Sequence, residues 1–268
     1  MSGNIAYSFA AFACVLPVTL LTLSGRAMRN VPFWATLTLA VCGPIIWLVL
    51  RSEGGWSSDF SSALWITISF TLVCYSAVAI LTRQGWQLAA IVMPYMALLA
   101  LIAAIWEKAG TGATNSPINN PWVIFHIFVS VFTYAVVTTG ACAALAGHLR
   151  DRALKNKQPT AFTQRLPSMA DCDDLQVKLL SLGELVLGLG LITGMAATFN
   201  RDGTLLHFDH KTVLALLAFV VIGVLLIIHR KTGVHGKQAT RLILAAYLLL
   251  SLAYPGVKFV TDVLIGSS

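Results

Sequence analysis

Eight long apolar segments constrain this chain more than any other feature of its sequence. Each is close to the 20 or so residues that an α-helix needs to cross a bilayer core about 30 Å thick. The segments are continuously apolar, whereas the strands of a membrane barrel alternate apolar and polar residues. The sequence therefore predicts an all-α, polytopic membrane helical bundle with about eight transmembrane helices. The segments lie near residues 5–24, 33–50, 62–82, 87–106, 122–147, 176–199, 212–229 and 242–264.

Basic residues are distributed unevenly between the two ends of these segments. Thirteen of the 18 Lys and Arg residues fall in or beside the first, third, fifth and seventh connections. Cytoplasmic loops carry the excess of positive charge in membrane proteins, so the asymmetry predicts that both termini lie outside. The net charge of +7 follows from this asymmetry. We therefore expect contact with membrane lipids and no binding to nucleic acid.

Two histidines, His207 and His210, stand in a short polar loop between two very apolar segments. Imidazole is the usual nitrogen ligand for haem iron and transition metals, so this loop is a candidate ligand site at the outer face. The alternative is structural: Asp209 caps the following helix, and His210 and Lys211 face water in its first turn. The five cysteines form no C-x-x-C-H motif, which excludes covalent attachment of haem.

Ionisable residues inside the apolar segments are the other candidates. His126 stands about one turn inside the fifth segment, and a histidine at that depth needs a partner. It is either a ligand at the outer face or a side chain satisfied by a backbone carbonyl between helices. Glu184 either joins a proton path, pairs with a cation or reaches water near the inner end. His148 and His229 lie at the inner ends of the fifth and seventh segments. They either form an inner pair of histidines beneath His126 and His210 or are solvated.

Four motifs after Trp122 occur in an order that is similar to a known family. His126 precedes Tyr134-Ala135, and the sixth segment carries glycines at 183, 190 and 194. Asp209-His210-Lys211 follows, and then come Gly233-x-x-Gly236-Lys237 and Tyr254-x-Gly256-Val257. This half of the chain resembles the cytochrome c assembly (CcsA/CcmC-type) family of haem-handling membrane proteins. All seven tryptophans lie at or before Trp122, and the LxHFDHKT motif resembles the tryptophan-poor YpjD/HemX-like branch of that family.

The resemblance implies a function and a set of site residues. It implies a divergent four-helix membrane region at 1–106 and a haem-handling membrane region at 107–268. The implied function is binding or handling of haem b at the outer face of the bacterial inner membrane, in cytochrome c biogenesis. The implied partners are haem, apocytochrome and other maturation proteins. The resemblance carries His126 over directly as an iron ligand, and His229 resembles a family histidine near the inner side. From the chemistry of the residues themselves we expect His210 as a second iron ligand, Trp122 and Phe208 over the ring, Lys211 at the propionates and Asp209 beside His210, with His207 as a further candidate.

Two other classes of function stay open at this point. The first is a ligand-free regulatory or scaffold membrane protein, which the missing tryptophans favour. The second is a small-solute transporter, which the scarcity of intramembrane charge and the lack of a repeat disfavour. The residues assemble no nucleophile, base and oxyanion set and no nucleotide-binding glycine motif, so we expect a protein that is not an enzyme.

Overall fold

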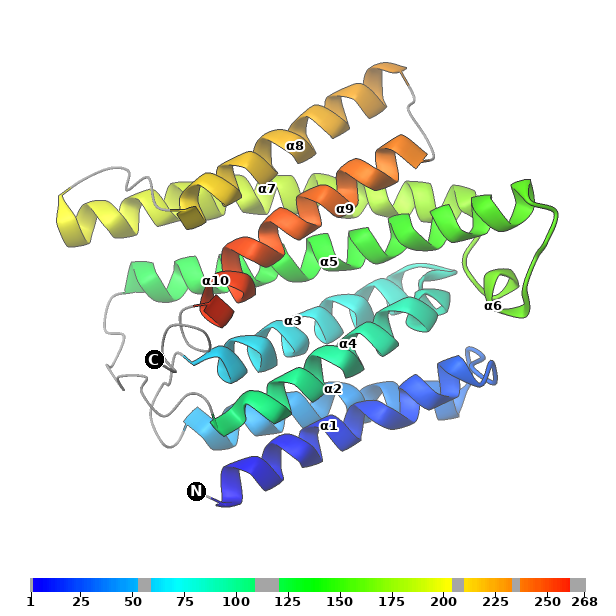
Figure 1. Cartoon of the computed structure of the whole chain (residues 1–268), viewed down its shortest axis with the longest axis horizontal. Coiled ribbons are helices and arrows are strands. Elements are labelled where there is room, and N and C mark those ends of the chain that lie inside the picture. The colour runs from blue at the N-terminus through cyan, green and yellow to red at the C-terminus, as the bar shows by residue number, and fades with distance from the viewer. Residues whose placement is uncertain (1, 53–58, 109–120, 204–209, 233–236, 261–268) are drawn as a thin grey trace. The chain divides into compact units, whose positions relative to one another are not determined.

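The computed structural model describes residues 2–52, 59–108, 121–203, 210–232 and 237–260, and every regular element among them is helical (Figure 1). Seven helices in these ranges are long and apolar enough to cross a membrane. The prediction of an all-α polytopic membrane protein is therefore confirmed. The long helices are α1 (Ser2–Leu23), α2 (Val31–Ser52), α3 (Phe60–Leu81), α4 (Ala89–Ile105), α5 (Pro121–Lys155), α7 (Met169–Asp202) and α8 (His210–Thr232).

The segment expected as an eighth span is broken into three helical pieces. The α-helix α9 (Lys237–Ser251) is followed by a π-helical turn, η3 (Leu252–Gly256), and by α10 (Val257–Phe259). Pro255 lies inside the π turn. Proline has no backbone N–H, and its ring clashes with the carbonyl four residues earlier in an α-helix. A wider π turn relieves that clash, which accounts for the short α9.

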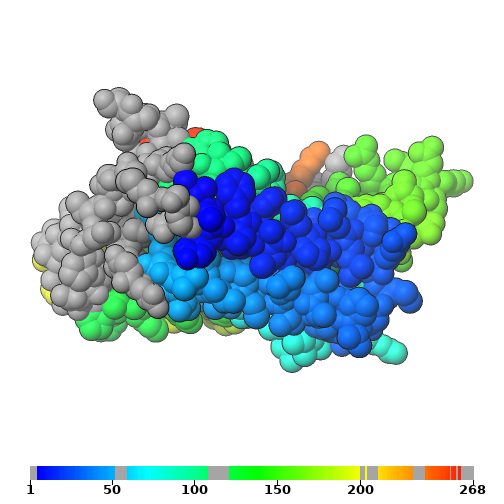
Figure 2. Space-filling model, turned by 90° about the horizontal axis from the view of Figure 1, so that it is seen from below, coloured from blue at the N-terminus to red at the C-terminus, as the bar shows by residue number. Residues whose placement is uncertain are grey.

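The chain divides into two compact units. Unit 1 comprises Met1–Pro117, Gln164–Pro167 and Lys258–Ser268. It contains α1 to α4, and Figure 2 shows α1 and α2 lying side by side along one face. A side chain at Gly43 of α2 would overlap Cys14 of α1, so the two helices approach closely there. The unit's largest fully buried side chains on α3 and α4 are Trp65, Ile68, Leu72, Tyr75, Met93 and Met96.

Unit 2 comprises Ile118–Thr163 and Ser168–Val257, and its frame is the pair α5 and α7. These helices run antiparallel, because Gly140 on α5 packs on Leu180 whereas Val129, earlier on α5, packs on Gly190, later on α7. Gly183 of α7 likewise meets Val137. Glycines at these positions let the two backbones approach, as the small-residue pattern predicts. The pair therefore holds the start of α5 against the end of α7.

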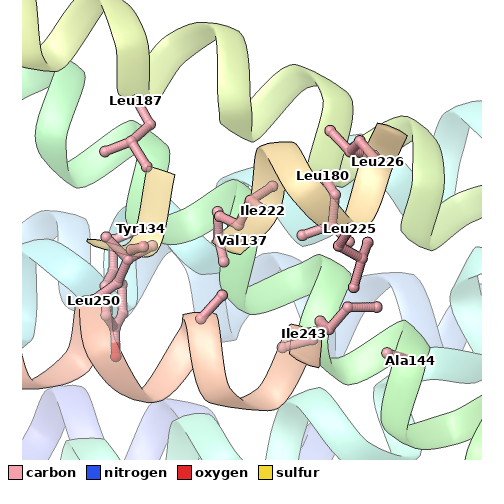
Figure 3. Close-up of a cluster of buried hydrophobic side chains, with 13 residues drawn as sticks. Tyr134, Val137, Ala144, Leu180, Leu187, Ile222, Leu225, Leu226, Ile243 and Leu250 are labelled. Atoms are coloured by element: carbon pink, nitrogen blue, oxygen red, sulfur yellow. The ribbon is translucent and has the colours of Figure 1, made fainter. Parts of the chain in front are cut away.

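The core of unit 2 joins four helices (Figure 3). Leu187 of α7, Ile222 of α8 and Leu250 of α9 are buried in one cluster with Tyr134 of α5. The Tyr134 hydroxyl lies 2.9 Å from that of Tyr247 and 3.2 Å from Ser251 Oγ. A buried hydroxyl requires such partners, so this triad fixes α9 against α5.

Candidate functional site

His126 lies where α5 passes the last glycines of α7. Its Nδ1 is 3.1 Å from the carbonyl oxygen of Gly190 and 3.3 Å from Thr193 Oγ1. Thr193 is 3% exposed, and its own hydroxyl donates to the same carbonyl over 3.0 Å. The imidazole is half-buried between the two helices. The contact with the Gly190 carbonyl is the one expected if His126 is a side chain that a backbone carbonyl satisfies between two helices. The same contact determines which ring nitrogen carries the proton.

The Gly190 carbonyl can only accept a hydrogen bond, so the neutral imidazole of His126 carries its proton on Nδ1. Its Nε2 then keeps a lone pair. Ser130 Oγ, one turn along α5, lies 3.5 Å from that atom. Metal-binding histidines commonly donate the other ring N–H to a backbone carbonyl, which fixes the tautomer and the orientation of the ring. The arrangement therefore suits ligation through Nε2.

Gly194 allows the His126 ring to lie flat against α7. A Cβ at this position would be 3.0 Å from Cε1 and 3.4 Å from Nδ1 of the imidazole. Such contacts are tighter than nearly all contacts of a real Cβ, so an added methyl would shift the ring by a few tenths of an ångström. Thr193, Ser130 and the Gly190 carbonyl were missed by the sequence reasoning. The available signal was spacing: Ser130 is four residues after His126, and Thr193 lies inside the G-x-x-x-G motif.

The other expected outer residues are described only in part. Trp122, four residues before His126 on α5, is 48% exposed and offers apolar ring surface one turn away. Lys211 is exposed in the first turn of α8. His210 begins that helix, but its side chain lies outside the described residues, as do His207, Phe208 and Asp209. The roles of these four side chains stay predictions.

His229 of α8 lies beside the start of α7, whereas His126 of α5 contacts α7 near its end. Its Nε2 is 4.0 Å from an Asp173 carboxylate oxygen near the start of α7. Asp173 precedes Gly190 by 17 residues, which is about 25 Å along a helix. His229 and His126 therefore do not share one site. On α5, His148 has a buried Nδ1 with no hydrogen-bond partner among the described residues.

The number of ligating side chains at the site favours haem over a bare metal ion. The described residues contain no group of three or more His, Cys, Asp or Glu side chains that could hold a metal ion. Haem iron needs only one or two axial protein ligands, because the porphyrin supplies four nitrogens. A single oriented imidazole beside exposed aromatic surface is compatible with that requirement.

Seven apolar helices and an oriented histidine within one of them define a polytopic α-helical membrane protein with a candidate ligand site. The family model described as "Cytochrome C assembly protein" matches residues 34–265. The chain belongs to this family.

Several relatives extend this comparison. A protein of Azospirillum brasilense, named "Uncharacterized 28.8 kDa protein in nifR3-like 5'region", is 44% identical over 99% of this chain and all of its own length. "Inner membrane protein YpjD" of Escherichia coli (strain K12) is 30% identical over 72% of each chain. "Cytochrome c biogenesis protein CcsA" of Prochlorococcus marinus (strain MIT 9303) is 23% identical over 95% of this chain and 90% of its own. No solved structure matches the chain.

Proposed function

We propose that this protein binds haem b through His126 at the outer face of the bacterial inner membrane and acts in cytochrome c biogenesis. Family membership and a relative named for cytochrome c biogenesis support the process. The relative named as an inner membrane protein supports the location. The placement at the outer face rests on the distribution of Lys and Arg.

The single observation that carries the proposal is the hydrogen bond from His126 Nδ1 to the Gly190 carbonyl. It holds the proton on Nδ1 and leaves Nε2 as the donor atom for iron. When bound, haem would supply an iron that an imidazole can ligate and an apolar ring with two propionates. In this chain His126 would ligate the iron, and Trp122 would cover part of the ring. Lys211 would pair with a propionate by a charge-assisted hydrogen bond.

Two further roles belong to the same proposal. His210 would be the second iron ligand, with Asp209, His207 and Phe208 as its near neighbours in the sequence. The protein would present or hold haem for apocytochrome or for other maturation proteins, and it would catalyse no bond formation of its own.

The test is the haem content of the full chain, purified in mild detergent from haem-replete cells. We expect a Soret band and nearly one haem b per chain after pyridine extraction. His126→Ala should lose most of that haem without unfolding, because it removes one polar side chain from an otherwise apolar helix. His148→Ala is the matched control, since it alters the same helix about 33 Å away.

Two results would contradict the proposal. One is a parent protein that stays colourless when haem is added. The other is an H126A variant that binds haem as well as the parent does. Equal loss in H126A and H148A, with loss of helix content, would assign the effect to folding and not to ligation.

A second candidate is a regulatory or scaffold protein of the same family that binds no haem. The specific observation in its favour is the absence of tryptophan after Trp122, which includes the whole loop before α8. A parent protein that remains colourless would support this candidate.

A further inference from the structure

A buried polar cluster links the four long helices of unit 1. Glu107, just after α4, is 7% exposed. Its Oε2 accepts hydrogen bonds from Ser8 Oγ of α1 at 2.9 Å and from Ser61 Oγ of α3 at 2.7 Å. Its Oε1 forms an ion pair with Arg51 Nη1 of α2. One carboxyl group therefore contacts side chains from the three other helices.

A second carboxylate competes for the same guanidinium. Asp59 is 1% exposed, and its Oδ1 lies 3.2 Å from Arg51 Nη2. Asp59 also caps α3 by accepting from the backbone N–H and the hydroxyl of Ser62. These charged groups act on Glu107 from α2 and from the start of α3, while α1 contributes the Ser8 hydroxyl. If both carboxyls were ionised, these three described side chains would carry two negative charges and one positive charge.

Aromatic rings shield the cluster from water on one side. Arg51 Cζ lies 5.3 Å from the centroid of the Trp47 ring, and that ring is 5.4 Å from the ring of Trp65. Trp65 is fully buried. The Trp47 indole N–H donates to Ser8 Oγ over 2.7 Å, which directs the Ser8 proton toward Glu107. An excess negative charge is costly in such surroundings unless a proton or a cation compensates it.

The hydrogen bonds around Ser61 indicate that a proton, and not a cation, compensates the excess negative charge of the cluster. Ser61 Oγ lies 2.8 Å from the Ala103 carbonyl as well as 2.7 Å from Glu107 Oε2. A hydroxyl has only one proton and cannot donate to both oxygens. If Glu107 Oε2 carries a proton, it donates to Ser61 Oγ, and Ser61 donates to Ala103. Every short contact then contains a hydrogen, and Arg51 remains paired with Asp59.

We propose that Glu107 is a proton-binding site that holds the four helices of unit 1 together when it is protonated and loosens them when it releases the proton. Burial raises the pKa of Glu107 above its ordinary value, although the Ser61 hydrogen bond and the charge of Arg51 act in the opposite direction. A carboxyl that is more basic in the folded than in the unfolded chain stabilises the fold below its unfolded pKa. This stabilisation is lost as the pH rises through its folded pKa.

The experiment is an infrared pH titration of the full chain in detergent, with parent and Glu107→Gln spectra subtracted. The difference should contain the carbonyl band of a protonated carboxylic acid, and this band should disappear at a pH above the range in which an ordinary glutamic acid titrates. The melting temperature of the parent should fall as the pH rises through the same midpoint. Glu107→Gln should lack that fall, because the amide resembles the protonated carboxyl and does not titrate.

Asp59→Asn is the control that separates proton binding from a purely structural role. Removing the second carboxylate removes a nearby negative charge and its competition for Arg51, so proton binding should weaken about tenfold or more and the midpoint should move to lower pH. A difference spectrum without a protonated-acid band at any pH would overturn the proposal. A midpoint that is identical in parent and Asp59→Asn would also overturn it.

Discussion

Replacing Gly194 by alanine tests whether the close packing of His126 on α7 matters for ligand binding. The new methyl would lie 3.0 Å from Cε1 and 3.4 Å from Nδ1 of the imidazole, so the ring must move. The bond from Nδ1 to the Gly190 carbonyl is already 3.1 Å long and has little margin. We therefore expect this hydrogen bond to break, and with it the fixed orientation of Nε2.

The expected magnitudes differ for stability and for haem. Loss of the hydrogen bond lowers the free energy of unfolding by about 0.5–1.5 kcal/mol. Alanine in place of glycine inside a helix raises it by about 0.5–1 kcal/mol. The free energy of unfolding should thus change by about 1 kcal/mol or less. Loss of the group that orients a ligating histidine typically weakens metal binding about 10–100-fold. Haem affinity should therefore fall far more than stability does.

Two other glycines of α7 provide matched controls. A methyl at Gly190 would be 3.5 Å from Val129 Cγ1, an ordinary contact, and the variant keeps the carbonyl that accepts from His126. Gly190→Ala should retain haem. A methyl at Gly183 would be 2.9 Å from Val137 Cγ2. Gly183→Ala should therefore destabilise the fold by about 1–3 kcal/mol while the folded fraction binds haem normally.

The assay is haem titration by absorption, with thermal unfolding followed by circular dichroism on the same samples. Unchanged haem affinity in Gly194→Ala would refute the role assigned to the Nδ1 hydrogen bond. Equal losses of haem affinity in Gly183→Ala and Gly194→Ala would also refute it, because general packing would then explain both.

The remaining predictions concern stability. Tyr134→Phe removes a hydroxyl that contacts two hydroxyls of α9, so the free energy of unfolding should fall by about 1–3 kcal/mol in chemical or thermal denaturation; an unchanged melting curve would show that the triad is not stabilising. Gly25 has φ +70° and packs against the Arg165 guanidinium, whereas Gly203 has φ +69° and no atom of a described residue within 4 Å of an added Cβ. Gly203→Ala should cost about 1–2 kcal/mol from the left-handed backbone alone, and Gly25→Ala should cost a similar amount in the same denaturation assay, because the guanidinium is the far end of a flexible side chain and can move away; a much larger loss at Gly25 would contradict this freedom of Arg165.

Apolar length predicts most of this fold, and its failures have local physical causes. Seven of the eight expected segments are helices of membrane-spanning length among the described residues. The last segment differs because Pro255 forces a π turn. Hydropathy averages over about 20 residues and does not register the loss of one backbone donor, so the shortening of α9 could not follow from the apolar pattern alone.

The candidate sites were predictable to different degrees. His126 stands out in the sequence because an imidazole in an apolar segment is rare and requires a partner. Its partners on α7 are more than 60 residues away, and the G-x-x-x-G motif that contains Thr193 indicates close helix packing without indicating that His126 lies there. Glu107 and Arg51 are 56 residues apart. They follow two apolar segments that end on the same predicted side of the membrane, which was the available signal for their pairing.

The lengths of α5 and α7 have a consequence for communication across the membrane. Helices of 35 and 34 residues are about 50 Å long, whereas the bilayer core is about 30 Å thick. Because Gly147 of α5 still packs against Cys172 of α7, the two helices stay joined toward the charged end of α5. The packed pair is therefore continuous from His126 to the region of Cys172, so a partner that bound beyond the bilayer core at the charged end would contact the same two helices that hold the imidazole.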